Sequence, residues 1–146
     1  MKNNYLYKNV IFKIFTFIGL LVITSSSMAD WTMLGKGEGR TSYIDLSTIH
    51  KQGNLVKVWV LYDFLNEAET QDGYKFLSSA VQMEVNCEEE QIHIVLMSAY
   101  SKNMAQGITV MPNKESQNKW HSAAPNTGES NVMKVACGKV RLRSSN

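Results

Sequence analysis

Cysteine, proline and histidine are scarce in this sequence. Its 146 residues include two cysteines, two prolines and three histidines. Two cysteines allow only one pairing, Cys87 with Cys137, which excludes a disulfide-dense scaffold. The histidines lie far apart in the sequence and show none of the short spacings of metal-binding histidines. We therefore predict one disulfide, no metal site and no bound cofactor.

The sequence also lacks the motifs of common catalytic sites. It contains no Gly-x-Ser-x-Gly segment around a nucleophilic serine. The glycine-rich stretch 35–39 is not followed by the Lys-Ser/Thr pair of a phosphate-binding loop. An enzyme is therefore not predicted, and only two or more of His50, His93 and His121 meeting in one cleft would revive that reading.

Two aspartates near strand ends are a formal candidate for a carboxylate pair. They are Asp45 and Asp63. The place of Asp45 at the end of a predicted strand favours a different role, in which its side chain caps the turn that follows.

The longest apolar run lies near the N-terminus. Residues 14–23 read IFTFIGLLVI, with three lysines before them and the small-x-small sequence Ser27-Met28-Ala29 after them. This order is typical of a secretory signal peptide, and the run is shorter than the about 20 residues of a membrane-spanning helix. We predict a signal peptide at 1–29, one mature domain at 30–146, and no integral membrane segment after cleavage.

Removal of the signal changes the charge balance. The whole sequence has 15 basic and 13 acidic residues, a net charge of +2. Three of the basic residues and none of the acidic ones lie in the predicted signal, so the mature chain carries a net charge of −1. Such a chain has no electrostatic footprint for nucleic acid, which is therefore not a predicted partner.

Six stretches of the mature chain have the composition and alternation of β-strands. We expect the intervening residues 46–52 to form a connector with room for a helical turn, 66–73 to form a loop, and Pro112 to end the last strand. The predicted strands are residues 31–34, 41–45, 55–64, 75–87, 92–101 and 108–111.

The strand at 75–87 places Cys87 on the same face as Val81, Met83 and Val85. Alternation assigns this face to the core, so the sulfur of Cys87 is expected to point toward the core.

A short helix is predicted near the C-terminus. Met133, Ala136, Cys137 and Val140 recur there at helical spacing. Asn126 is the expected N-cap, with Glu129 completing a capping box, and Gly138 is the expected stop.

The two cysteines therefore connect the core face of the sheet to the buried face of this helix. We predict an α+β fold, a six-stranded antiparallel β-sheet with a C-terminal helix packed on one face and tethered by a Cys87–Cys137 disulfide.

Aromatic side chains mostly build cores, and we expect this of most tryptophans and tyrosines here. Trp59 and Leu61 are of further interest because they point away from the all-apolar face of their strand. If the helix covers the all-apolar face, Trp59 and Leu61 belong to an exposed patch that marks a partner surface or a dimer interface.

Several short motifs follow one another in a distinctive order. They are Trp31, Tyr43-Ile44-Asp45, Ile49, Gly53, Val58-Trp59-Val60-Leu61, Val85-Asn86-Cys87, Trp120, Pro125 and Val135-Ala136-Cys137. Over nearly all of the predicted mature chain, this ordered set resembles the bacterial surface-adhesin protein E family.

The resemblance implies a six-stranded antiparallel sheet with a disulfide-tethered helix and a tendency to form homodimers. It also implies adhesion, the binding of host extracellular-matrix and serum proteins such as vitronectin and laminin through a basic, loop-rich stretch. The corresponding stretch here, residues 66–75, is acidic.

We therefore predict an exported, non-enzymatic binding protein of the cell surface, outer membrane or periplasm, with host matrix or serum proteins as partners. The alternative is a periplasmic small-ligand-binding or stress-related protein that binds an apolar molecule against the Trp59 face. A deep apolar pocket with a few convergent polar groups would favour the alternative.

The predicted signal peptide has a direct test. Mass spectrometry of the exported protein is expected to find Asp30 as the first residue, because the small-x-small sequence precedes it. Recovery of a chain that still begins at Met1 would contradict the prediction.

Overall fold

The computed structural model describes residues 29–37, 39–115 and 119–142. Apart from Ala29, the predicted signal peptide lies outside these residues. The described elements are β1 (Trp31–Gly37), β2 (Arg40–Gln52), β3 (Leu55–Glu69), β4 (Lys75–Asn86), β5 (Gln91–Tyr100), β6 (Thr109–Glu115), β7 (His121–Ser122) and α2 (Gly128–Ala136). No helix among the described residues is long and apolar enough to cross a membrane.

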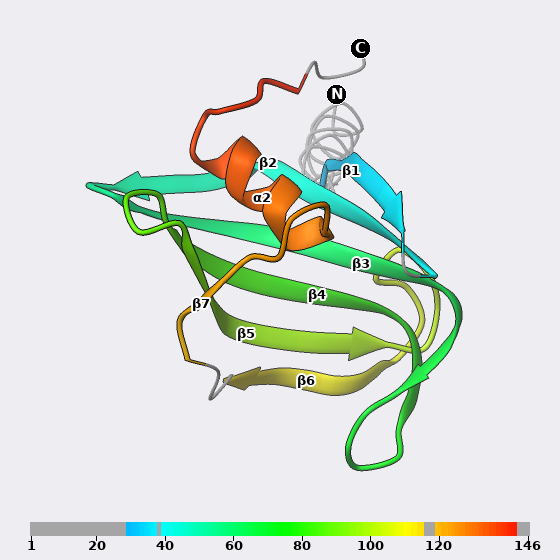
Figure 1. The fold of residues 1–146 in the computed structure, drawn as a ribbon. Coiled ribbons are helices and arrows are strands. Elements are labelled where there is room, and N and C mark those ends of the chain that lie inside the picture. Colours follow the sequence, from blue (N-terminus) through cyan, green and yellow to red (C-terminus); the bar gives the residue numbers. More distant parts are fainter. Residues whose placement is uncertain (1–28, 38, 116–118, 143–146) are drawn as a thin grey trace, which may run out of the picture.

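Six strands form one antiparallel sheet in the order of the chain, from β1 to β6. The two-residue strand β7 pairs with the start of β5. The helix α2 lies across one face of the sheet and packs against β1, β2 and β3 (Figure 1). The predicted α+β architecture is confirmed.

The main core lies between α2 and the sheet. On β3 and β4 it contains the alternating residues Val56, Val58, Val60, Val81 and Met83, each at most 1% exposed. β-branched valines suit this position because their stiff side chains pack well on a pleated surface. The helix contributes Val132, Met133 and Ala136.

The predicted connector at 46–52 is wrong, because β2 continues to Gln52. The pairing with β3 is interrupted between Asp45 and His50 and then resumes. Within the interruption, the Thr48 hydroxyl accepts a hydrogen bond from the Trp59 amide at 3.0 Å, in place of a backbone carbonyl. The Thr48 side chain thus keeps β2 hydrogen-bonded to β3 where the backbone pairing is interrupted.

Two further strands run beyond their predicted ends. β3 reaches Glu69, past a register shift, so most of the expected loop at 66–73 is strand and the turn begins at Thr70. β6 continues through Pro112 to Glu115. Because β6 is an edge strand, a residue without a backbone N–H is tolerated there.

The helix begins one residue later than predicted. Thr127 is the N-cap, and its hydroxyl accepts a hydrogen bond from the Ser130 amide at 3.2 Å. Asn126, the predicted cap, instead has a positive φ of 61°. The predicted stop at Gly138 is confirmed by its φ of 72°, and Val140, expected on the buried face, lies beyond the helix and is exposed.

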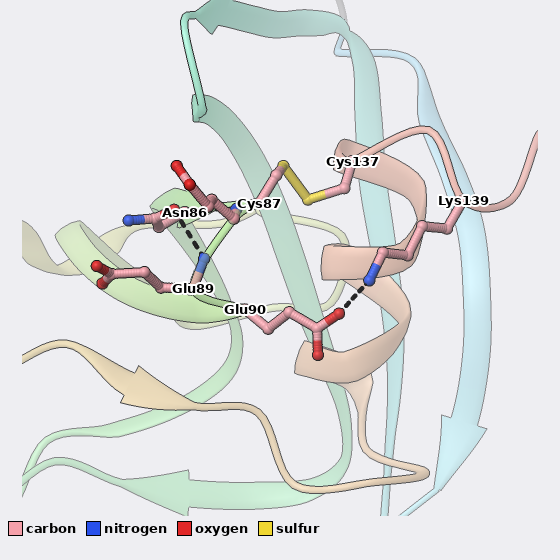
Figure 2. The surroundings of a disulfide bond; sticks show 7 residues. Asn86, Cys87, Glu89, Glu90, Cys137 and Lys139 are labelled. Carbon is pink, nitrogen blue, oxygen red and sulfur yellow. Dashed lines mark hydrogen bonds and ion pairs between the residues drawn. A yellow bond between two sulfur atoms is a disulfide. The ribbon is translucent and has the colours of Figure 1, made fainter.

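The Cys87–Cys137 disulfide joins the end of β4 to the C-cap of α2 (Figure 2). Beside it, the Lys139 ammonium donates a hydrogen bond to Glu90 in the β4–β5 turn. This hydrogen bond and the positive charge of Lys139 hold the pKa of the Glu90 carboxyl below its ordinary value. Figure 2 shows both connections reaching the same end of the helix.

Replacement of both cysteines by serine is expected to lower the free energy of unfolding by about 4 kcal/mol. The physical reason is the greater chain entropy of the unfolded state once a link across 50 residues is lost. Urea unfolding followed by circular dichroism measures the change, and the reduced wild-type protein is the control. Equal unfolding free energies for the oxidised, reduced and substituted proteins would contradict this expectation.

Candidate functional site

The face of the sheet opposite α2 holds the residues that were expected to form a partner surface. Trp59 and Leu61 both lie on this face, since α2 covers the Val56, Val58 and Val60 side of β3. Trp59 is half-buried, but Leu61 is fully buried. The expectation of an exposed Leu61 is therefore wrong. A loop folds back onto this face of the sheet.

That loop connects β5 to β6 and is held to the sheet by two polar side chains. The Asp63 carboxylate accepts hydrogen bonds from the Met104 amide at 2.7 Å and from the Asn103 side chain at 3.1 Å. The Ser78 hydroxyl donates to the Lys102 carbonyl at 2.5 Å and accepts from the Ala105 amide at 2.9 Å. Asp63 and Ser78 pair directly across β3 and β4, so they form one anchor.

The anchored loop has an unusual backbone. Met104 and Ala105 are consecutive residues with φ of 56°, a left-handed conformation that side chains disfavour. Gly107 has a φ of 79°, and a Cβ there would lie 2.4 Å from the Ser101 hydroxyl. Such strained conformations persist only where the surroundings enforce them, and they often occur at functional sites.

A hollow of about 450 Å³ lies between this loop and the sheet. We call it the Trp59 hollow. It is lined by Ala29, Trp31, Asp45, Thr48, Trp59, Ala80, Tyr100, Met104, Ala105 and Gln106. Three aromatic rings and a thioether form much of its wall, and Asp45 is the single charged residue among its lining.

Asp45 is only 5% exposed. Its Oδ1 atom accepts hydrogen bonds from the amide and the hydroxyl of Ser47, at 3.0 and 2.6 Å. The Asp45 side chain thus binds the residue that follows it closely in the chain, but the turn that it was expected to cap is absent, because β2 continues through Ser47 to Gln52. The pairing of Asp45 with Asp63 as two working carboxylates is not supported, because the Asp63 side chain is occupied by the loop.

A second hollow, of about 630 Å³, lies beside the tip of the β3–β4 hairpin. We call it the hairpin hollow. Phe76, Ile94, Met97 and Met111 give it an apolar floor. Its other lining residues are polar or charged, and they are Glu69, Thr70, Gln71, Asp72, Lys114 and Glu115.

Two of the three histidines are neighbours in the sheet, since His121 pairs with Ile92 and therefore lies beside His93. His93 packs against the Trp120 ring, whereas the Nε2 atom of His121 lies 3.2 Å from the Glu129 carboxylate.

His50 and His93 belong to one row across the sheet, but Lys57 and Glu84 on the intervening strands separate them by about 14 Å. Among the described residues, no group of three His, Cys, Asp or Glu side chains is arranged to hold a metal ion.

The sequence pattern did not predict the role of the loop residues Met104 and Ala105 or the placement of Asp45 in a hollow. One signal for the loop was present. Ser78 occupies a central strand, where a buried hydroxyl needs a partner, and its partners are in the loop. Nothing in the alternation of residues 101–108 points to their left-handed backbone.

Comparisons with known proteins give one family and one fold. The family model described as surface-adhesin protein E matches residues 31–138. A crystal form of Haemophilus influenzae protein E has 17% identity to this chain and a TM-score of 0.56, with 73% of this chain and 92% of that chain covered. No curated protein matches the sequence.

Protein E from non-typeable Haemophilus influenzae is similar in the same way. It has 18% identity and a TM-score of 0.55, and the similarity covers 74% of this chain and 75% of that chain. At this identity the likeness establishes the shared fold, the sheet with its tethered helix.

Substitution of Asp63 by alanine is expected to release the loop from the sheet. The change removes two hydrogen bonds to a carboxylate, which lowers the free energy of unfolding by about 2 kcal/mol. Hydrogen exchange measured by mass spectrometry is expected to be faster at Met104 and its neighbours. Asp72→Ala, at an exposed carboxylate, is the control, and unchanged exchange in Asp63→Ala would refute the anchor.

Proposed function

The chain belongs to the surface-adhesin protein E family, and from this membership we propose that it is an exported adhesin that binds host extracellular-matrix or serum proteins. The family and the fold support an adhesin-like surface protein. The proposal itself has three parts. They are the host partner, the location at the cell surface and not in the periplasm, and an activity that is binding and not catalysis.

The hairpin hollow is the observation that carries the proposal. It combines an apolar floor with a rim that bears Glu69, Asp72 and Glu115 against the single cation Lys114. Protein interfaces typically place an apolar centre within a polar rim. The excess of negative charge favours a basic segment of the partner, because complementary charges speed the encounter and fix the register.

The ion pair at the rim, and a second one in the adjoining hairpin, are weak. Lys114 lies 4.0 Å from Asp72 at the rim, and Lys75 lies 3.5 Å from Glu67 in the hairpin, with all four side chains at least half exposed. Exposed pairs of this kind contribute about 0–1 kcal/mol. Glu69 and Glu115 make no ion pair with the described residues, so both are open to a cationic partner.

A second candidate function is supported by the Trp59 hollow. A deep apolar pocket with a few convergent polar groups would favour the alternative of a small-ligand-binding protein. The Trp59 hollow supports it through its aromatic walls and its single carboxylate. The use of Trp59 as a partner surface, and the formation of a homodimer, stay predictions.

Binding of the purified protein to immobilised matrix and serum proteins tests the proposal. We expect Glu69→Lys combined with Glu115→Lys to weaken binding about tenfold or more, through lost attraction and new repulsion at the rim. Glu89→Lys is the matched control, because Glu89 lies at the opposite end of β4, in the β4–β5 turn. Equal binding by all three proteins, or none by the wild type, would refute the proposal.

The surface location needs a separate measurement. Antibodies are expected to label intact cells as strongly as cells with a permeabilised outer envelope. Labelling only after permeabilisation would place the protein in the periplasm and rule out the surface role.

A further inference from the structure

We propose that the Trp59 hollow is a binding site for a small organic cation that carries an alkylated ammonium group. This inference goes beyond adhesion and does not depend on it, because the Trp59 hollow lies on the face opposite α2 and shares no residue with the hairpin hollow.

The charge of the hollow selects a cation. Asp45 is its single charged lining residue, and the lining includes no lysine or arginine. The Oδ1 atom of Asp45 is occupied by Ser47. The Oδ2 atom accepts no hydrogen bond from the described residues, and it is not one of their fully buried polar atoms without a partner. Because Asp45 lines the hollow, its negative charge would repel a carboxylate or phosphate ligand there.

The walls suit an alkylated ammonium better than a metal ion. Trp31 and Trp59 supply indole rings and Tyr100 a phenol ring, and the faces of such rings attract cations. Met104 adds a polarisable thioether. A metal ion requires several oxygen or nitrogen ligands, and Asp45 is the single carboxylate here. Recognition of quaternary ammonium groups uses several aromatic rings around the charge.

The hollow is preorganised by two separate irregularities of the chain. In the interruption of β2, Asp45 is held by its hydrogen bonds with Ser47. The anchor formed by Asp63 and Ser78 holds Met104 and Ala105 in the left-handed conformation at the other side. A site held rigid before binding loses less entropy when the ligand arrives. Its volume of about 450 Å³ falls within the usual range of small-ligand pockets.

A free N-terminal amine beside Trp31 would compete with an added cation for the site. Ala29 lines the hollow, and cleavage after it would leave a charged amine on Asp30, next to Trp31. The experiment therefore uses the exported protein with its first residue determined by mass spectrometry. Occupation of the hollow by this amine would exclude an added cation and would overturn the proposal.

Choline is the probe, and 3,3-dimethylbutan-1-ol is its neutral counterpart of the same shape. Calorimetry measures affinity, and NMR shifts of the Trp31 and Trp59 indole N–H groups locate the binding. We expect choline to bind at least about tenfold more tightly than the neutral alcohol, because only choline gains from Asp45 and the ring faces. Shifts confined to Trp120 would place the ligand elsewhere and overturn the proposal.

Two variants separate charge from shape. Asp45→Asn keeps an oxygen for Ser47 and is expected to lose at least about tenfold in choline affinity, with binding of the alcohol unchanged. Trp59→Leu is expected to weaken choline binding similarly, and Glu89→Gln is the control at an exposed carboxylate that lines neither hollow. Thermal unfolding confirms that each variant is folded. Equal affinity for choline and the alcohol, no binding of either, or unchanged choline binding in Asp45→Asn would overturn the proposal.

Discussion

The covalent link between Cys87 and Cys137 determines which parts of the sheet are covered. A nine-residue helix is marginal in isolation, so its position depends on packing and on this link. The link holds the end of α2 at the end of β4, and the helix then lies across β1, β2 and β3. The helix leaves the rest of the sheet uncovered. Part of it is covered by the β5–β6 loop, and part of it stays open beside the β3–β4 hairpin.

The two hollows lie beside different segments of the chain and differ in their charged residues. On the helix side, the extended β3–β4 hairpin stands beside an apolar floor and gives it an acidic rim. On the opposite side, a strained loop closes over Trp59 and leaves a smaller hollow with one carboxylate. The first is suited to a basic segment of a protein, and the second to a compact cation. The net negative charge of the predicted mature chain is consistent with both.

Alternation and helical spacing predicted the elements that bury apolar residues on a regular backbone. The core face of β4 and the side of Cys87 followed from a period of two, and the helix followed from the spacing around Met133. The burial of Leu61 and the path of the β5–β6 loop were not predictable in this way. The loop is held by four hydrogen bonds made with Asp63 and Ser78, and none of them leaves a periodic trace in the sequence.

The unpredicted irregularities of the chain and the candidate ligand site share a physical origin. At residues 46–52 and again at the β5–β6 loop, side-chain oxygens replace backbone partners, so the chain leaves its regular path without losing hydrogen bonds. Those departures place Asp45 and Met104 at opposite sides of one hollow. Ser78 carries one such signal: its hydroxyl has no exposed surface and therefore needs a hydrogen-bond partner, and both of its partners lie in the loop. A loop that returns to a buried polar residue in this way makes an open face of the sheet concave.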